Sequence, residues 1–254
     1  MREAGLLFDL PRNAIFPIDE AILRLDEGRH PYEVANGGQI AENWQAELRA
    51  NPSLFDGEVV LLSQMAYADR RVEARCHAVR YSTFLHWRRQ RPTASAEHVF
   101  AHAMPVCRDN ALVAARMRAD TANPGQVYFA AGSFEPSDFF GGVADIDYNM
   151  TREVREETGI DLGPARRDAG YHAFSGPTGT VIVKRFYLDE DAATVAGRIA
   201  RFVAAESDPE IVGPVVIRGP DDLPQGLAPH MPPLIDWHFS TPAGLAKSGG
   251  SASL

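Results

Sequence analysis

Three glutamates on one short helix constrain this chain more than any other feature of its sequence. Glu153, Glu156 and Glu157 stand at positions i, i+3 and i+4, so in an α-helix they share about one third of the circumference. Like charges at this spacing repel one another and weaken an isolated helix. The fold must therefore place this side of the helix where something compensates the charge. A divalent cation that prefers hard oxygen ligands, such as Mg²⁺ or Mn²⁺, would do so.

The ends of this helix are predicted from its capping residues. Asp147 or Asn149 is a suitable N-cap, and Gly159 followed by Ile160 suits a left-handed C-cap with an apolar contact. We therefore expect a helix from about Asn149 to Thr158. An ordinary solvated helix that carries several acids is the alternative interpretation of the glutamates taken alone.

The rest of the chain alternates strand-like and helical segments irregularly. Apolar runs and alternating patterns predict strands at residues 59–67, 72–79, 99–106, 112–117, 126–131, 171–174, 180–188 and 210–217. Helical periodicity predicts helices at residues 39–50, 81–90 and 192–205, with a short helical turn at 232–239. Residues 1–38 and 132–147 are expected to be irregular. This order indicates a mixed sheet flanked by helices, and not a doubly wound parallel sheet.

Composition and charge argue against several classes of protein. The chain has 254 residues, of which 45% are hydrophobic, enough to bury a sizeable core. A formal charge of −9 argues against binding to nucleic acid, because phosphate contacts need clustered Lys and Arg. Cys76 and Cys107 are too few for a disulfide framework or a zinc site, and we expect both to be buried and reduced. Since no apolar run suits a signal peptide or a membrane span, we expect a cytoplasmic protein without a membrane partner.

The segment around the glutamates resembles the signature of a known family. Residues 152–160 read Arg-Glu-Val-Arg-Glu-Glu-Thr-Gly-Ile and match the second half of the Nudix box at every fixed position. Upstream, Gly132 stands where the box begins, and Asp138 takes the place of its first glutamate. Residues 139–151 separate Asp138 from Arg152, a longer spacing than the family has, so the loop before the helix carries an insertion.

The resemblance implies a fold and a division of the chain. The expected fold is a Nudix-type α/β/α sandwich on a mixed sheet, with an N-terminal α+β extension. The Nudix hydrolase domain is expected at residues 96–240, and residues 1–95 form an N-terminal α+β region packed on it. Residues 241–254, rich in Gly, Ser and Ala, are expected to be a disordered tail.

The resemblance also implies the residues of the site. The expected ligands of Mg²⁺ or Mn²⁺ are the carboxylates of Asp138, Glu153, Glu156 and Glu157. Arg152 is expected to orient a neighbouring carboxylate through its guanidinium, and with Glu153 and Glu157 it makes up the expected catalytic set. Glu153 is the first choice for the base that takes a proton from the attacking water. A glutamate from a loop outside the box, Glu206 or Glu210, is the alternative base.

The first third of the chain indicates a substrate class. Asn43-Trp44, residues 51–57 and residues 81–85 look like a divergent Nudix subgroup that includes the UDP-glucose and UDP-galactose hydrolase. This resemblance implies a small-molecule nucleoside diphosphate derivative, such as a UDP-sugar, cleaved to a nucleoside monophosphate and a phosphate ester. A coenzyme A or ADP-ribose diphosphatase and a non-catalytic, nucleotide-sensing Nudix domain are the alternatives. Many members of the family form homodimers, and the sequence does not decide the oligomeric state.

Several conspicuous side chains are expected to have structural roles only. Trp44, Phe55 and Phe84 are expected in the core and not as a platform for base stacking. Lys184 and Arg185 lie on a predicted strand and could meet phosphates, but single basic residues on strands usually face solvent.

Overall fold

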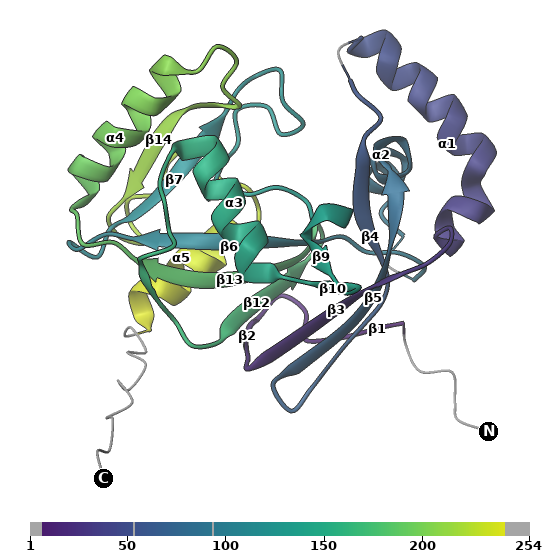
Figure 1. The fold of residues 1–254 in the computed structure, drawn as a ribbon, viewed down its shortest axis with the longest axis horizontal. Helices are drawn as coiled ribbons and strands as arrows, with labels where there is room; N and C mark the ends of the chain where they lie inside the picture. The colour runs from purple at the N-terminus through teal and green to yellow at the C-terminus, as the bar shows by residue number, and fades with distance from the viewer. Residues whose placement is uncertain (1–6, 53, 93, 242–254) are drawn as a thin grey trace.

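Two mixed β-sheets and five α-helices make up the part of the chain that the structure describes (Figure 1). The structure is a computed structural model, and it describes residues 7–52, 54–92 and 94–241. The predicted α/β fold on a mixed sheet is confirmed. The predicted disordered tail lies outside the described residues, apart from Thr241.

The first sheet is built mainly from the N-terminal region and has the strand order β1-β4-β5-β3-β10-β9. Its strands are β1 (Phe8–Asp9), β3 (Glu20–Asp26), β4 (Glu58–Ala68), β5 (Arg71–Arg80), β9 (Phe139–Phe140) and β10 (Val143–Ala144). Helices α1 (Pro31–Ala50) and α2 (Tyr81–Gln90) pack against each other beside this sheet. β3 runs parallel to β5, while β4 and β5 form an antiparallel hairpin, so the sheet is mixed.

The second sheet has the strand order β14-β7-β6-β13-β12-β2. Its strands are β2 (Ile15–Ile18), β6 (Val99–Val106), β7 (Leu112–Met117), β12 (Tyr171–Gly176), β13 (Gly179–Tyr187) and β14 (Ile211–Ile217), with the short strands β8 (Val127–Tyr128) on β7 and β11 (Arg166–Arg167) on β13. β6 and β13 are parallel, and the other pairs are antiparallel.

Helices cover both faces of the second sheet. They are α3 (Ile146–Thr158), α4 (Ala192–Ala205) and α5 (Met231–Ser240). Lys184 on β13 donates to Asp147 of α3 at 2.7 Å, whereas its neighbour Arg185 lies over the ring of Trp237 of α5. Because successive strand residues point to opposite faces, α3 and α5 cover opposite sides of the sheet. This is the expected α/β/α sandwich.

The sequence predicted that Lys184 and Arg185 face solvent, but both are buried. Their exposed fractions are 6% and 3%. Each is paired with a carboxylate, Lys184 with Asp147 and Arg185 with Asp168. The prediction was wrong because the partners come from other elements, which a single strand does not reveal.

The two sheets exchange strands across the predicted domain boundary at residue 95. β2, from the N-terminal region, pairs with β12 of the second sheet. β9 and β10, from the insertion before α3, form a hairpin whose second strand pairs with β3 of the first sheet. The insertion therefore fastens the start of α3 to the N-terminal region. The division into folding units at residue 95 stays a prediction.

Several predicted elements needed correction. Residues 7–38 are not irregular, because they contain β1, β2, β3 and the first turns of α1, which begins at Pro31 and passes through Gly37-Gly38. Residues 132–147 contain β9, β10 and a 3₁₀ turn at Pro136–Asp138 instead of a plain loop. The strand expected at 126–131 is reduced to Val127–Tyr128. These short strands depend on remote partners, so local patterns do not reveal them.

One large core and one smaller cluster hold the fold together. Phe84 and Trp87 of α2 belong to the smaller cluster, beside β4. Phe84 is buried as expected and Trp44 is half-buried, but Phe55 is 82% exposed, contrary to the prediction. Both cysteines are buried and free. No helix within the described ranges is long and apolar enough to cross a membrane.

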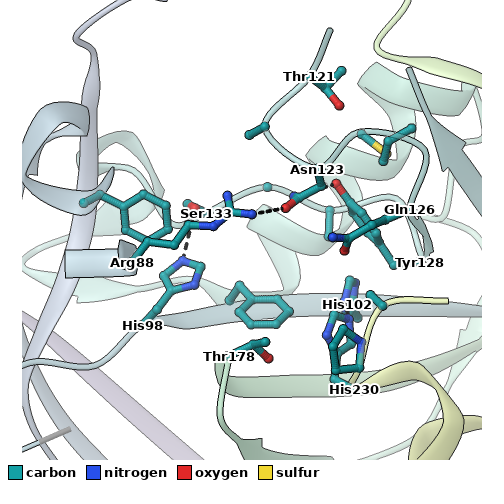
Figure 2. Close-up of a pocket in the computed structure, with 18 of the residues that line it drawn as sticks. Arg88, His98, His102, Thr121, Asn123, Gln126, Tyr128, Ser133, Thr178 and His230 are labelled. Carbon is teal, nitrogen blue, oxygen red and sulfur yellow. Dashed lines mark hydrogen bonds between the residues drawn. The ribbon is translucent and has the colours of Figure 1, made fainter. Parts of the chain in front are cut away.

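A cavity of about 330 Å³ lies where α2 faces the second sheet (Figure 2). Its lining comes from α2, β6, the loop around Asn123, and the residues just before α5. Ala131, Gly132 and Ser133 form part of its wall. This loop also contacts the glutamates of α3, so the cavity and the glutamates are neighbours.

Candidate active site

Helix α3 carries the predicted glutamates and is capped at both ends. The Asp145 side chain accepts from the Tyr148 amide at 2.9 Å, so Asp145 is the N-cap. The helix starts at Ile146, earlier than predicted, because Asp147 and Asn149 are engaged elsewhere. Gly159 ends it in the left-handed conformation, with φ of 69°, as predicted.

The packing of α3 decides which glutamates are buried. Met150 and Val154 are each 1% exposed and anchor the helix on the core. Glu153 and Glu157 are each 9% exposed, whereas the Glu156 side chain is 54% exposed. The helix therefore turns two of its three glutamates inward.

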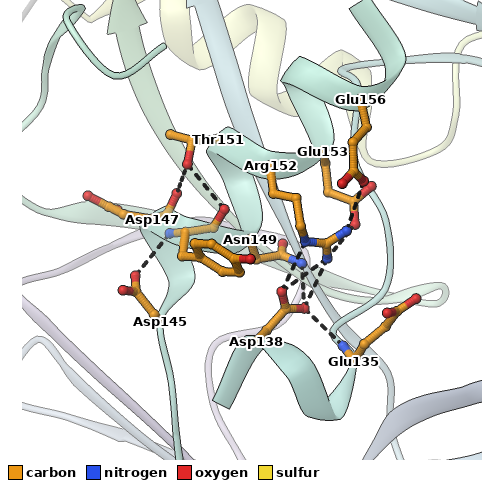
Figure 3. Close-up of polar contacts among 10 residues, drawn as sticks. Glu135, Asp138, Asp145, Asp147, Asn149, Thr151, Arg152, Glu153 and Glu156 are labelled. Atoms are coloured by element: carbon orange, nitrogen blue, oxygen red, sulfur yellow. Dashed lines mark hydrogen bonds and ion pairs between the residues drawn. The ribbon is translucent and has the colours of Figure 1, made fainter. Parts of the chain in front are cut away.

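Asp138 sits at the centre of the polar network in front of α3 (Figure 3). Its side chain is fully buried and accepts from the Asn149 amide at 2.9 Å and from the Glu135 backbone at 2.9 Å. Arg152 Nη2 lies 3.0 Å from Oδ1 and 3.2 Å from Oδ2. Both carboxylate oxygens are thus occupied by protein donors, which makes Asp138 an anchor for Arg152.

Arg152 spreads its guanidinium over three carboxylates. Besides Asp138, Nη2 lies 2.8 Å from Glu153 Oε1, and Nη1 lies 3.0 Å from Glu156 Oε2 (Figure 3). The planar guanidinium presents its N–H donors in a rigid fork, so holding one edge on Asp138 orients the rest. Arg152 therefore links Glu153 to Asp138 and Glu156, and it neutralises part of the charge on the helix.

Glu153 packs against the loop at Gly132. A Cβ built on Gly132 would lie 2.6 Å from Glu153 Cδ and 2.7 Å from Oε2, closer than real Cβ atoms approach. A side chain at this position would displace the Glu153 carboxylate. Burial raises the pKa of Glu153 to about 7, against the lowering effect of Arg152.

Glu157 lies one helical turn beyond Glu153 and contacts the same loop. Its Oε1 accepts from the Ala131 amide at 3.1 Å. Its Oε2 is buried and has no hydrogen-bond partner among the described residues. Burial, followed by the charges of Glu153 and Glu210, raises the pKa of Glu157 well above its ordinary value. A buried carboxylate oxygen without a donor is costly unless a ligand completes it.

The predicted site residues are only partly brought together. Glu153 and Glu157 share the loop of residues 131–132, and Arg152 links Glu153 to Asp138 and Glu156. Within the described ranges, no three His, Cys, Asp or Glu side chains converge as a metal site does. Asp138 is paired with Arg152, and Glu156 lies on the exposed side of α3, where it also pairs with Arg152.

The two loop glutamates differ in position. Glu210 lines the cavity, and its charge contributes to the raised pKa of Glu157. Glu206 is exposed and ends α4, where its amide donates to Phe202 and Val203 carbonyls. Of the two alternative bases, Glu210 is therefore the one beside the buried glutamates.

The sequence did not reveal the role of Asn149 in this site or the contact that Gly132 makes. Asn149 is fully buried and donates to Asp138, whereas the sequence suggested only a helix cap. Gly132 was singled out for its spacing, without the close approach of Glu153. A glycine in the loop before α3 indicates that another group packs closely against the backbone, but it does not identify that group.

Comparison with known proteins gives a partial likeness. No protein-family model and no curated protein matches the chain. Among solved structures, a MutT protein from Methanosarcina mazei Go1 is 17% identical with a TM-score of 0.39, and the match covers 56% of this chain and 93% of that one. The ORF135 protein of E. coli is 18% identical with a TM-score of 0.35, covering 58% and 96%. DR0079 from Deinococcus radiodurans is 13% identical with a TM-score of 0.35, covering 49% and 68%.

Proposed function

We propose that the chain is a Nudix hydrolase that cleaves the pyrophosphate link of a nucleoside diphosphate derivative with the help of Mg²⁺ or Mn²⁺. The observation that carries the proposal is Glu157 Oε2, a buried carboxylate oxygen without a donor, one helical turn from Glu153 and beside a cavity-lining loop. An ordinary surface helix has no reason to bury two mutually repelling glutamates in this way.

The residues present suit a divalent cation. Glu153 and Glu157 offer hard oxygen ligands, which Mg²⁺ and Mn²⁺ prefer. Gly132 leaves the space that the Glu153 carboxylate needs. Glu156 is the third proposed ligand, since its side chain is exposed and held only by Arg152. When bound, the cation would neutralise phosphate oxygens and lower the pKa of a water.

The other residues position the carboxylates. Asp138, expected from the family pattern to be a ligand, is better suited to hold Arg152, because both of its oxygens already accept from protein donors. Arg152 in turn orients Glu153, which we propose as the base that takes a proton from the attacking water. Glu210, which lines the cavity, is the alternative base.

The proposed substrate is a nucleotide sugar such as a UDP-sugar. The support is the resemblance of residues 43–57 and 81–85 to the subgroup that includes the UDP-glucose and UDP-galactose hydrolase. The products would be a nucleoside monophosphate and a sugar phosphate.

The experiment is hydrolysis of a panel of UDP-sugars, ADP-ribose, coenzyme A and nucleoside triphosphates with Mg²⁺ or Mn²⁺. Glu157→Gln keeps the shape of the side chain and removes its charge. Loss of a residue that only supports a metal ligand costs about 10- to 100-fold in activity, so loss of a ligand is expected to lower turnover at least about 100-fold. Glu42→Gln, on the exposed side of α1, is the matched control and is expected to leave turnover unchanged.

Two results would contradict the proposal. Full activity of Glu157→Gln with either metal would show that the assigned site is wrong. Absence of phosphate-containing products from every substrate of the panel, with binding retained, would favour a nucleotide-sensing domain.

A further inference from the structure

The cavity beside the glutamates has a wall of aromatic rings. Phe100 on β6 is half-buried and lines the cavity. Its ring lies 5.1 Å from that of His98 in a stacked arrangement and 5.1 Å from that of His230 in an edge arrangement. Phe84 and Tyr128 extend the wall on the two sides, through contacts with His98 and His102. Flat ligands stack on such a surface with little loss of side-chain freedom.

The polar and charged lining of the cavity disfavours a cation. Burial lowers the pKa of His98 to about 3 and that of His230 to about 4, so both rings are neutral at neutral pH. The charged residues in the lining are Arg88, Arg91 and Glu210. Arg88, which Figure 2 shows on the same side of the cavity as His98, donates to Asn123 at 2.7 Å. Two arginines against one glutamate leave the lining with a net positive charge, and with the neutral rings this suits an uncharged ring joined to an anion.

The loop of residues 131–133 lies between the aromatic wall and the carboxylates, because it lines the cavity and also contacts the glutamates. Phe100 forms a β-bridge with Ser133, so the backbone of the ring wall is hydrogen-bonded to the loop that follows Gly132. Gly132 contacts Glu153, and the preceding Ala131 contacts Glu157. A ligand with its ring on Phe100 and its phosphates at the glutamates would therefore pass the loop of residues 131–133. A nucleoside diphosphate has this order, since a ribose joins its base to its phosphates.

We propose that this cavity holds the nucleobase of the substrate, stacked on Phe100, with its ribose leading past Gly132 toward Glu153 and Glu157. The assignment rests on the proposed hydrolase function for the position of the diphosphate. The cavity volume of about 330 Å³ lies at the lower end of ligand pockets, which span about 300–1,000 Å³.

The test is nucleotide binding in EDTA, measured by calorimetry, so that no metal chemistry contributes. The ligands are UMP, AMP and ribose 5-phosphate, which lacks a base. UMP or AMP is expected to bind at least about 10-fold more tightly than ribose 5-phosphate, as expected for one stacked base. Phe100→Leu is expected to weaken this nucleotide binding about 5- to 100-fold and to leave the affinity for ribose 5-phosphate unchanged. Phe16→Leu is the matched control, because Phe16 is a buried strand phenylalanine that contacts Tyr67 and not the cavity.

The outcomes separate this inference from the proposed hydrolase. Equal affinity of the wild type for UMP, AMP and ribose 5-phosphate overturns the nucleobase site, even where hydrolysis is intact. This comparison uses only the wild type, so it tests the site even if Phe100→Leu does not fold. Nucleotide affinity of folded Phe100→Leu equal to that of the wild type also overturns it. Base-dependent binding together with a fully active Glu157→Gln supports the nucleobase site and removes only the metal-hydrolase assignment.

Discussion

Gly132→Ala tests the site without altering any carboxylate. The added Cβ would lie 2.6 Å from Glu153 Cδ and 2.7 Å from Oε2. Since carbon atoms in contact sit about 3.5–4.0 Å apart, the Glu153 carboxylate must move by about 1 Å. The backbone at Gly132 does not require the left-handed conformation, so alanine itself is tolerated there.

Gly132→Ala should therefore change the stability of the fold little and lower turnover strongly. The displaced group is the far end of a flexible side chain, so the free energy of unfolding should change by less than about 1 kcal/mol. A misplacement of about 1 Å in a catalytic site can lower the rate about 100-fold. We expect a folded variant whose turnover with Mg²⁺ falls by about that factor.

The assay pairs urea denaturation with hydrolysis of the best substrate from the panel. Gly197→Ala is the matched control, because a Cβ on this glycine of α4 would make only an ordinary contact with Arg201, at 3.7 Å. This control should be stabilised by up to about 1 kcal/mol, since alanine is the better helix former, with unchanged turnover. A folded Gly132→Ala with wild-type turnover would refute the reasoning, because the Glu153 carboxylate would then not act from its place beside the loop.

Two further predictions concern stability. Burial holds the pKa of His230 at about 4, below the ordinary 6.5, so its contribution to stability is fully present above pH 6.5 and is lost as the pH falls toward 4. Urea titrations should show that this residue lowers the free energy of unfolding by about 3 kcal/mol over that pH range. In His230→Gln the free energy of unfolding should depend less steeply on pH. An equally steep dependence in the variant would contradict the assignment. Asp168→Asn should cost about 3–5 kcal/mol in unfolding free energy, because it leaves Arg185, 3% exposed and 2.8 Å from the Asp168 carboxylate, as an unpaired buried charge. Asp208→Asn, on an 86% exposed side chain paired with Arg118, should cost less than about 1 kcal/mol, and a similar loss in both variants would argue against the role of burial.

Local signals were sufficient where an element depends on its own residues. α2 and α4, and the strands β6 and β7, have the bounds that periodicity and turn residues predicted. The C-terminal end of α3 was also predicted, because glycine readily adopts the left-handed conformation that Gly159 has in the structure. Such features are encoded within one or two turns of chain, so reading neighbours along the sequence is enough.

The first strands and the insertion before α3 were missed for the opposite reason. β2 has only four residues and is stabilised by β12, and β10 has two residues and is stabilised by β3. Strands this short have little periodicity of their own. Their existence depends on edges that distant segments provide.

In the candidate site, too, some features follow from the local sequence and others only from tertiary packing. The spacing of Glu153, Glu156 and Glu157 is written in the sequence, and with it the clustering of negative charge on one side of a helix. Which of them is buried was decided only when α3 packed on the core and the loop of Gly132 came against it. The aromatic cavity has no signature in any single segment, because α2, β6 and the residues before α5 meet there only in the folded chain. A helix determines angles between its own side chains, whereas burial and pKa depend on what tertiary packing brings near them.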